Sequence, residues 1–369
     1  MTTFEQQPSV AIADPWVGDE EKAAVERVLD SGQLAHGDEV AAFESEFADY
    51  CDCEHGLATA NGTAALHAAL EGLGIGPGDT VVTTPFTFIA TANAVRLVGA
   101  EPVFADTDPE TYNIDPEAVR ARIRAADGDV DAILAVHLYG HPAPLSELAA
   151  IADEYDAALV EDCAQAHGAR HEGRPVGSVG DVGCFSFYPT KNMTTGEGGM
   201  VVTDRDDVHE RAGQFVDHGR DGHSGHVRVG HNLRLPDLAA AIGRVQLRRL
   251  PEFVEKRREN ARRLTEAIEE ADIEAPTERS GVRHAYHQYT VRSDRRDELA
   301  DRLAEFGVDT AVYYPKAVHK EPAYDEFDPE APVAERAAET VLSLPVHPRL
   351  SRRDVDAIVT ALGSLTDGF

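Results

Sequence analysis

The stretch Ala157-Ala-Leu-Val-Glu161-Asp162-Cys-Ala-Gln165 has the pattern of a buried strand that ends in polar side chains. A short, almost wholly apolar strand is typical of a parallel sheet that is covered by helices on both faces. In open α/β sheets, ligands bind beyond the carboxyl ends of the strands. The stretch therefore predicts a fold class, and it places Asp162 and Gln165 where such a fold binds its ligand.

Strands and helices alternate on both sides of this stretch. We expect strands at residues 57–59, 80–83, 101–104, 132–137, 157–161, 183–187 and 199–203. Helical apolar spacing marks residues 20–30, 40–50 and 62–72, and again 145–155 between two of the strands. This order predicts an α/β fold, with a mainly parallel sheet between two layers of helices.

The order of the predicted elements changes after Gly230. An Ala-rich helix is expected from Pro236 to Leu250, and a second from Pro251 to about Ala271, because proline fits the first turn of a helix. Strands at 288–292 and 310–313, with helices at 296–306 and from 352 onward, then indicate a smaller α+β domain. We expect a large domain over residues 1–250 and a small C-terminal domain over residues 251–369.

The charge balance excludes some classes of function. The chain has 66 acidic and 34 basic residues and a net charge of −32, and the acidic residues are spread along its whole length. Nucleic-acid binding needs a basic footprint, so no nucleic-acid partner is expected. Diffuse acidity and only five lysines favour a halophile's cytoplasm, where molar salt shortens the Debye length to about 3 Å. A merely acidic mesophilic protein is the alternative.

Membrane and metal signals are weak. No run approaches the roughly 20 apolar residues of a membrane span, and no signal peptide is visible, so we expect a cytoplasmic protein without membrane contact. The four cysteines have no zinc-like spacing. Four histidines, at 218, 223, 226 and 231, lie in a Gly-rich stretch that is poorly suited to hold ligands rigidly. No metal site is expected.

Two polar turns follow predicted strands. Asn61-Gly-Thr-Ala-Ala-Leu66 is a strand-to-helix turn in which Gly62 and the free N–H groups at the helix start favour an anion. An ordinary capped helix is the alternative. Asp162 has the chemistry to keep a pyridinium nitrogen protonated. Taken alone, it fits the N-cap of a helix equally well.

Lys191 favours a functional role over a structural one for these turns. The segment Phe185-Ser-Phe-Tyr-Pro-Thr-Lys191-Asn192 leads into the Gly-rich reversal Gly196–Gly199. It places one of only five lysines on a turn between two buried strands. The surroundings are too apolar and too tightly turned for a surface lysine, which favours a functional role.

In their order along the chain, these motifs resemble the DegT/StrS-type family of sugar aminotransferases, which are fold-type-I enzymes dependent on pyridoxal 5'-phosphate (PLP). The resemblance covers almost the whole chain. It rests on the segments Pro85–Phe88, Val136–Gly140, Asp162–Gly168, Phe185–Lys191, Gly230–Arg234 and Leu342–Pro345.

The resemblance implies roles for individual residues. Lys191 would bind the cofactor covalently, and Asp162 would pair with its pyridinium nitrogen. Gln165 would contact the phenolic oxygen of the cofactor, and Phe88 would stack on its ring. The phosphate would be bound by Thr63, Ala64 through its backbone, Ser186 and, from the neighbouring subunit, Asn232.

The implied reaction is the transfer of an amino group, with glutamate as the usual donor, to a nucleotide-linked keto-sugar for surface polysaccharide or glycan biosynthesis. A homodimer with shared active sites is expected. Arg228, Tyr314 and His319 are the candidate substrate contacts, and His319 is expected to face the cleft because it follows an apolar run. In related sugar dehydratases a histidine replaces the lysine, so Lys191 favours transamination. A dehydratase and a non-catalytic regulatory protein of the same fold remain the alternatives.

Overall fold

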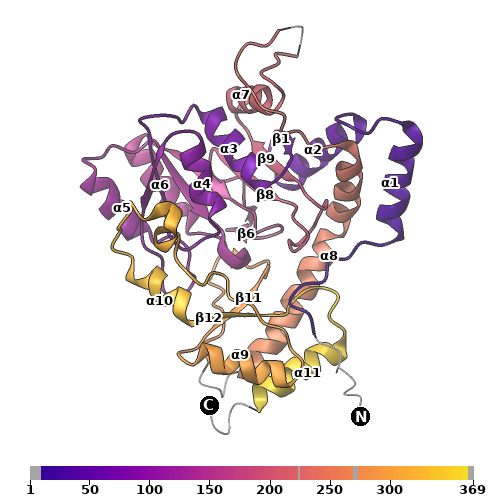
Figure 1. The fold of residues 1–369 in the computed structure, drawn as a ribbon, viewed down its shortest axis with the longest axis vertical. Coiled ribbons are helices and arrows are strands. Elements are labelled where there is room, and N and C mark those ends of the chain that lie inside the picture. The colour runs from indigo at the N-terminus through magenta and orange to yellow at the C-terminus, as the bar shows by residue number, and fades with distance from the viewer. Residues whose placement is uncertain (1–9, 223–224, 269–272, 365–369) are drawn as a thin grey trace.

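The computed structural model describes residues 10–222, 225–268 and 273–364. A seven-stranded sheet with the order β1-β9-β8-β5-β4-β2-β3 forms its centre (Figure 1). Its strands are β1 His55–Thr59, β2 Thr80–Thr83, β3 Glu101–Phe104, β4 Ala132–Val136, β5 Ala158–Asp162, β8 Val182–Ser186 and β9 Gly199–Thr203. The four pairs that join β3, β2, β4, β5 and β8 are parallel, whereas β9 is antiparallel to β1 and β8. The mainly parallel sheet is therefore confirmed.

Helices cover both faces of this sheet (Figure 1). They are α2 Asp38–Tyr50, α3 Gly62–Leu73, α4 Ala90–Leu97, α5 Pro116–Ala125, α6 Leu145–Tyr155 and α7 Asp206–Val216. Helix α1 Asp19–Ser31 lies farther out and packs against α8 Asp237–Ile268. Val160 and Val201 on one face share a core with Leu66 of α3. Phe185 on the other face packs against Phe47 of α2, with ring centroids 4.9 Å apart. Both faces are apolar because alternate strand residues point to opposite sides.

A single long helix occupies the region in which we expected two helices. Helix α8 runs from Asp237 to Ile268 with Pro251 inside it, so the expected helix break at this proline is wrong. Leu250 and Phe253 are buried on either side of the proline. Their packing holds the helix together across Pro251, although proline removes one backbone donor. Residues 269–271, the expected end of the second helix, lie outside the described residues, and the division at residue 250 stays a prediction.

The C-terminal part has its own apolar core. Ala261, Leu264 and Ile268 at the end of α8 pack with the two-stranded antiparallel sheet of β11 Tyr289–Arg292 and β12 Val341–Leu344. Around it lie α9 Arg296–Glu305, α10 Pro332–Thr340 and α11 Arg352–Gly363. Residues 310–313 form only an isolated bridge from Ala311 to Ser343, and β12 takes the expected strand's place.

Short elements join the two parts of the chain. Strand β10 Val282–Arg283 pairs with β6 Arg170–His171, which in turn pairs with β7 Arg174–Pro175. The short helices η1 Leu138–Gly140, η2 Val318–Lys320 and η3 Pro322–Tyr324 complete the elements. No helix among the described residues is long and apolar enough to cross a membrane.

Candidate active site

A cavity of about 810 Å³ opens at the carboxyl ends of β5 and β8. Its walls come from the start of α3, the segment before α4, the ends of the two strands and two segments of the C-terminal part. It brings together eight of the residues named from the sequence, namely Thr63, Ala64, Phe88, Asp162, Gln165, Ser186, Lys191 and Tyr314.

Lys191 lies in the turn that follows β8. Its backbone N–H donates to the carbonyl of Tyr188 at 2.9 Å, which closes the turn and directs the side chain to the cavity. Its amine has no hydrogen bond to any residue in the described part of the chain. Burial lowers the pKa of this amine to about 8, and the opposite charge of Asp162 limits the shift. The amine is therefore able to act as a nucleophile and as a proton acceptor near neutral pH.

Asp162 ends β5 and is almost fully buried. One carboxylate oxygen accepts from the Ala164 N–H at 3.1 Å, and the other accepts from the Thr91 hydroxyl at 2.9 Å. Thr91 lies 2.9 Å from the hydroxyl of Thr87. Burial raises the pKa of Asp162, so a positive group that binds beside it gains an unusually strong partner. Thr91 was not predicted from the sequence, because its partner Asp162 lies 71 residues further along the chain.

The start of α3 offers backbone donors to an anion. The Asn61 side chain accepts from the Ala64 N–H at 2.9 Å, so this donor is already used, contrary to the expectation that it contacts a phosphate. The N–H groups of Gly62 and Thr63 have no partner among the described residues. A Cβ at Gly62 would lie 2.6 Å from Cβ of Ser186. Glycine thus lets the helix start and the Ser186 hydroxyl form one cradle for an anion.

Aromatic and amide groups complete the cavity. The ring of Phe88 is 56% exposed and faces the cavity, with its centroid 6.0 Å from that of Tyr314. The amide of Gln165 is fixed at both ends, because its Nε2 donates to Tyr314 Oη at 2.9 Å and its Oε1 accepts from the Tyr139 N–H at 2.7 Å. A flat ring with a phosphate at one end, a ring nitrogen and a carbonyl carbon matches these groups, and PLP has all four features.

Three of the named residues lie outside the cavity lining. Asn232 is exposed, and its side-chain oxygen accepts from Arg234 at 3.0 and 3.1 Å. Arg228 forms an ion pair with Glu71.

His319 is buried in η2, and its Nε2 lies 3.1 Å from Glu335. The expectation that His319 faces the cleft is therefore wrong, because η2 turns its ring inward toward Phe104. His223, one of the loop histidines, lies outside the described residues.

Two further lining residues were missed. His287 and Gln288 reach the cavity from the segment before β11. The expected strand at 288–292 includes Gln288, but no local pattern showed that these two side chains reach the cavity, because long-range contacts place them. Among the lining residues that the structure describes, Lys191 is the only lysine or arginine.

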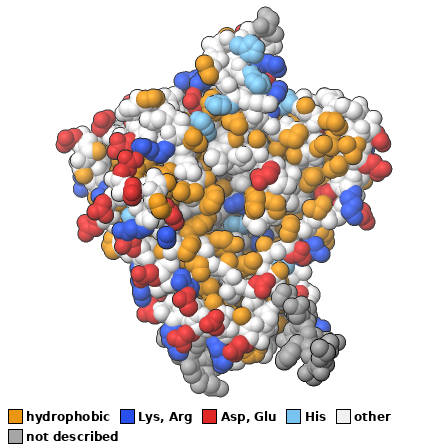
Figure 2. Space-filling view, viewed as in Figure 1, with side chains coloured by type: hydrophobic (Ala, Val, Ile, Leu, Met, Phe, Trp, Pro, Cys, Tyr) orange, Lys and Arg blue, Asp and Glu red, His pale blue; other side chains and the backbone are white. Residues whose placement is uncertain are grey.

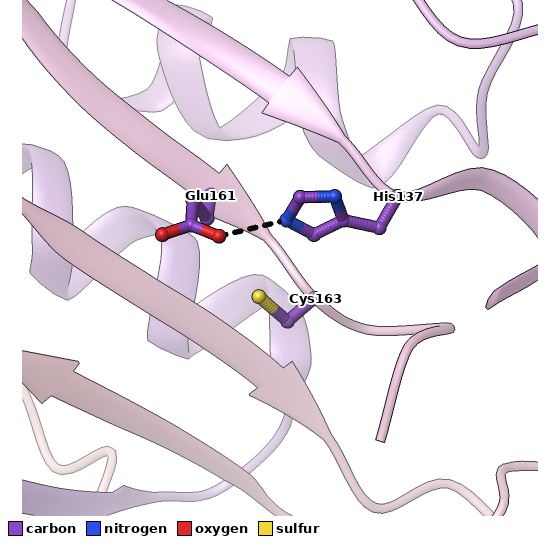
Figure 3. A group of neighbouring side chains, drawn as sticks. All are labelled: His137, Glu161 and Cys163. Carbon is purple, nitrogen blue, oxygen red and sulfur yellow. Dashed lines mark hydrogen bonds and ion pairs between the residues drawn. The ribbon is translucent and has the colours of Figure 1, made fainter. Parts of the chain in front are cut away.

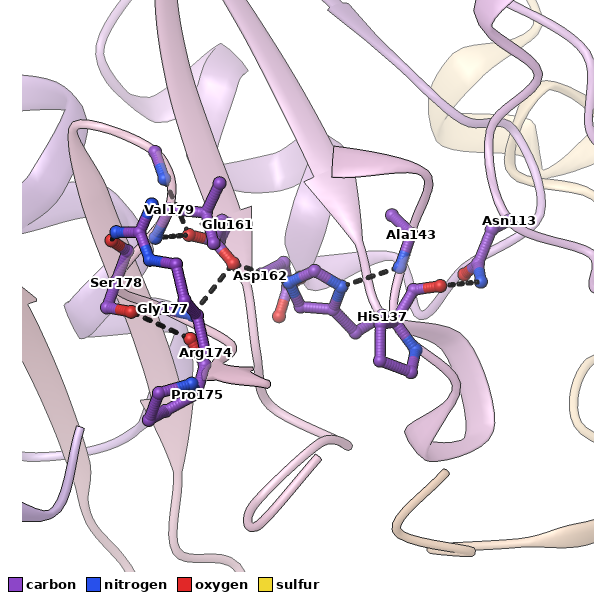
Figure 4. Close-up of polar contacts among 12 residues, drawn as sticks. Asn113, His137, Ala143, Glu161, Asp162, Arg174, Pro175, Gly177, Ser178 and Val179 are labelled. Atoms are coloured by element: carbon purple, nitrogen blue, oxygen red, sulfur yellow. Dashed lines mark hydrogen bonds and ion pairs between the residues drawn. The ribbon is translucent and has the colours of Figure 1, made fainter. Parts of the chain in front are cut away.

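A buried carboxylate supports the sheet next to Asp162. Glu161 accepts from His137 Nε2 at 3.0 Å and from the N–H groups of Gly177, Val179 and Gly180 at 2.7–2.8 Å (Figures 3 and 4). Because His137 Nδ1 accepts from the Ala143 N–H, this neutral ring must donate through Nε2.

Cys163 lies close to this pair. A cation would find no free lone pair on Glu161, because four donors already fill its oxygens. These donors lower the pKa of Glu161 although its burial opposes them. The pair therefore serves as an anchor between β4, β5 and the segment before β8.

Comparisons with known proteins match nearly the whole chain. Residues 15–363 match the DegT/DnrJ/EryC1/StrS aminotransferase family. The chain is 40% identical to a pleiotropic regulatory protein of Geobacillus stearothermophilus, over 94% of this chain and 96% of the relative. It is 38% identical to UDP-2-acetamido-2-deoxy-3-oxo-D-glucuronate aminotransferase of Pseudomonas aeruginosa, with the same two coverages.

A solved structure matches equally well. The crystal structure of DesV from S. venezuelae, in complex with a ketimine intermediate, superposes with a TM-score of 0.94 at 38% identity, over 98% of this chain and all of DesV.

Proposed function

The chain belongs to the DegT/DnrJ/EryC1/StrS aminotransferase family, whose cofactor is PLP, and from this premise we propose that it aminates a nucleotide-linked keto-sugar, with glutamate as the donor. One observation carries the proposal: Lys191 and Asp162 share a cavity whose other walls offer an anion cradle and a flat aromatic face. The name of the P. aeruginosa relative, a UDP-sugar aminotransferase, supports the substrate class. Amino sugars of this kind are building blocks of surface polysaccharides and glycans, which is the pathway we propose.

Each residue has a defined task in this reaction. When bound, PLP supplies an electron-withdrawing ring next to the carbon that exchanges a proton. Lys191 binds the cofactor covalently and, once released, takes a proton at Nζ and returns it, since its pKa of about 8 allows both steps. Asp162, fixed by Thr91, holds the positive ring nitrogen. Gln165 and Phe88 orient the ring, and Gly62, Thr63 and Ser186 bind its phosphate.

Three observations support a homodimer with shared sites. Asn232 is exposed and outside the cavity of its own chain, so it is available to a second copy. The described cavity lining supplies no arginine for a nucleotide diphosphate, which leaves this task to residues from elsewhere. Apolar side chains also gather on one face of the molecule, over its centre and upper right (Figure 2), and exposed apolar residues include Val17, Leu29, Phe88 and Leu97.

Complementation tests the dimer. Inactive variants Asn232→Ala and Lys191→Ala, mixed and refolded together, are expected to regain activity, because one site of each mixed dimer is then intact. A fully active monomer in sedimentation would contradict the proposal.

The acidic composition motivates a proposal about the setting. A cytoplasm with molar salt fits the net charge of −32, and the four free, buried cysteines fit a reducing compartment. The melting temperature is expected to rise between 0.1 M and several molar KCl, as the Debye length falls from about 10 Å to about 3 Å or less and self-repulsion is screened. A melting temperature that does not change with the KCl concentration would contradict the proposal of a halophilic host.

The name of the G. stearothermophilus relative, a pleiotropic regulatory protein, favours the regulatory alternative. The complete set of Lys191, Asp162 and Gln165 argues for the enzyme. The purified protein, incubated with glutamate and a UDP-linked 3-keto-sugar, is expected to yield the amino sugar and 2-oxoglutarate, as measured by mass spectrometry. Lys191→Ala serves as the control. Efficient transamination of simple 2-oxo acids without any exchange on UDP- or dTDP-linked keto-sugars would overturn the substrate class.

A further inference from the structure

Residues 285–288, here named the strap, lie beside the turn that carries Lys191. Ala285 donates its N–H to the Gly140 carbonyl at 2.9 Å, and Gln288 donates to the Tyr139 carbonyl at 3.1 Å. Asn192, the residue after Lys191, donates its side-chain amide to the Ala285 carbonyl at 3.1 Å. The strap is thus bonded at both ends to segments that form the active site.

The middle of the strap depends on Arg257 of α8. Nη1 of Arg257 donates to the carbonyls of Tyr286 and His287, both at 3.2 Å. Tyr286 has a φ of 43°, in the left-handed region that non-glycine residues seldom adopt. A Cβ at Gly140 would lie 2.9 Å from the His287 nitrogen, so the strap presses closely on the turn that holds Gln165. One guanidinium therefore fixes an unusual backbone conformation in contact with the active site.

The charge of Arg257 is not compensated. Its side chain is buried, and within the described chain no carboxylate lies at ion-pair distance from it. Burial alone lowers its pKa to about 9. Its neighbour Arg258, in contrast, pairs with Glu278 at 2.7 Å. A buried cation without a counter-ion is costly, and a neutral side chain would be cheaper if packing were its only task.

The surroundings of His287 indicate the function of the Arg257 charge. Its ring lines the cavity, and its Nδ1 has no hydrogen-bond partner among the described residues. Four groups with positive or potentially positive charge surround it on different segments: Lys191, Arg257, His167 and His284. Burial and these neighbours keep the pKa of His287 well below its usual range, although the Asp162 carboxylate shares the cavity. Both effects favour the uncharged form of the ring.

We propose, on the basis of the proposed function, that Arg257 is a positioning residue of the active site. Arg257 holds the strap so that an uncharged His287 ring faces the Lys191 amine. With the ring proton on Nε2, the unpartnered Nδ1 of His287 accepts a hydrogen bond from the amine each time the amine carries the migrating proton. It thereby stabilises the proton on Nζ without competing for it, because the ring itself is hard to protonate. The chain's own pair, His287 and Lys191, then sets the rate of proton transfer.

The ring of His287 gives a readout that does not depend on turnover. Its pH titration is followed by NMR in the cofactor-free protein, with the signal assigned by its loss in His287→Phe. In Arg257→Gln the midpoint is expected to rise by about one pH unit or more, because a nearby positive charge is removed. The matched control is Arg258→Gln, which removes the adjacent arginine and leaves the strap's carbonyl contacts; it is expected to leave the His287 midpoint unchanged.

Kinetics supply the second readout. Arg257→Gln and His287→Phe are each expected to lower kcat about tenfold, as is usual for a lost contact to a proton-transfer group, with KM within about twofold. Arg257→Lys is expected to recover part of the loss, since an ammonium keeps both the charge and a donor.

An unchanged His287 midpoint in folded Arg257→Gln would overturn the proposal. If Arg257→Gln fails to fold, wild-type kcat in His287→Phe would overturn it equally. Failure of the proposed function is a separate result, namely a wild-type enzyme that does not aminate any nucleotide-linked keto-sugar while the titrations behave as expected.

Discussion

The two walls of the cavity are built in different ways. One wall, the sheet-edge wall, consists of the ends of β5 and β8 and the start of α3, and it carries Asp162, Lys191 and Gly62. The other, the strap wall, consists of residues 285–288 and the segment around Tyr314. Side chains of the first wall are placed by short-range sequence patterns, whereas those of the second depend on contacts between distant segments. Chemistry is concentrated on the first wall, and its fine positioning depends on the second.

The largest effect is expected at the sheet-edge wall. Asp162→Asn keeps the shape but removes the charge that holds a positive ring nitrogen, so kcat is expected to fall on the order of 100-fold. Thr91→Val, which removes only the hydrogen bond to Asp162, is expected to cost about tenfold or less. Steady-state kinetics check both. Equal activity of Asp162→Asn and the wild type would show that this wall does not carry the chemistry.

A smaller effect is expected where the wall meets the anion. Gly62→Ala places a Cβ 2.6 Å from Cβ of Ser186, so the cradle must open. Cofactor affinity, measured by fluorescence titration of the cofactor-free protein, is expected to fall about tenfold. Gly213→Ala is the matched control, because its Cβ would meet no atom within 4 Å. Unchanged cofactor affinity in Gly62→Ala would show that the phosphate does not bind at this position.

The smallest effect is expected at Arg228, outside both walls. Arg228→Ala breaks the ion pair with Glu71 and is expected to change KM for the sugar by about twofold or less. The sequence-based hypothesis holds the opposite, that Arg228 contacts the substrate. A rise in KM for the sugar that clearly exceeds the change for glutamate would restore that hypothesis and extend the site beyond the described cavity.

The same contrast explains what the sequence could predict. The strands around Asp162 and the turn at Lys191 follow from apolar runs bounded by glycine and polar residues, and the structure has them within one or two residues of their expected limits. The helix break at Pro251 failed because packing of Leu250 and Phe253 outweighs one lost hydrogen bond. His287 and Thr91 were not predicted because their function depends on partners that lie far away in the sequence. His319 was misplaced because an apolar run says that a residue is buried, but not toward which side it turns.

Lys191 is expected to be the only lysine of the chain that binds the cofactor. Borohydride treatment of the purified protein, followed by proteolysis and mass spectrometry, fixes the cofactor to the lysine that holds it. We expect the adduct on the peptide that contains Lys191, the loss of the absorption of the imine between cofactor and lysine, and no adduct in Lys191→Ala. An adduct on Lys22, Lys256, Lys316 or Lys320 in the wild type would show that another lysine binds the cofactor.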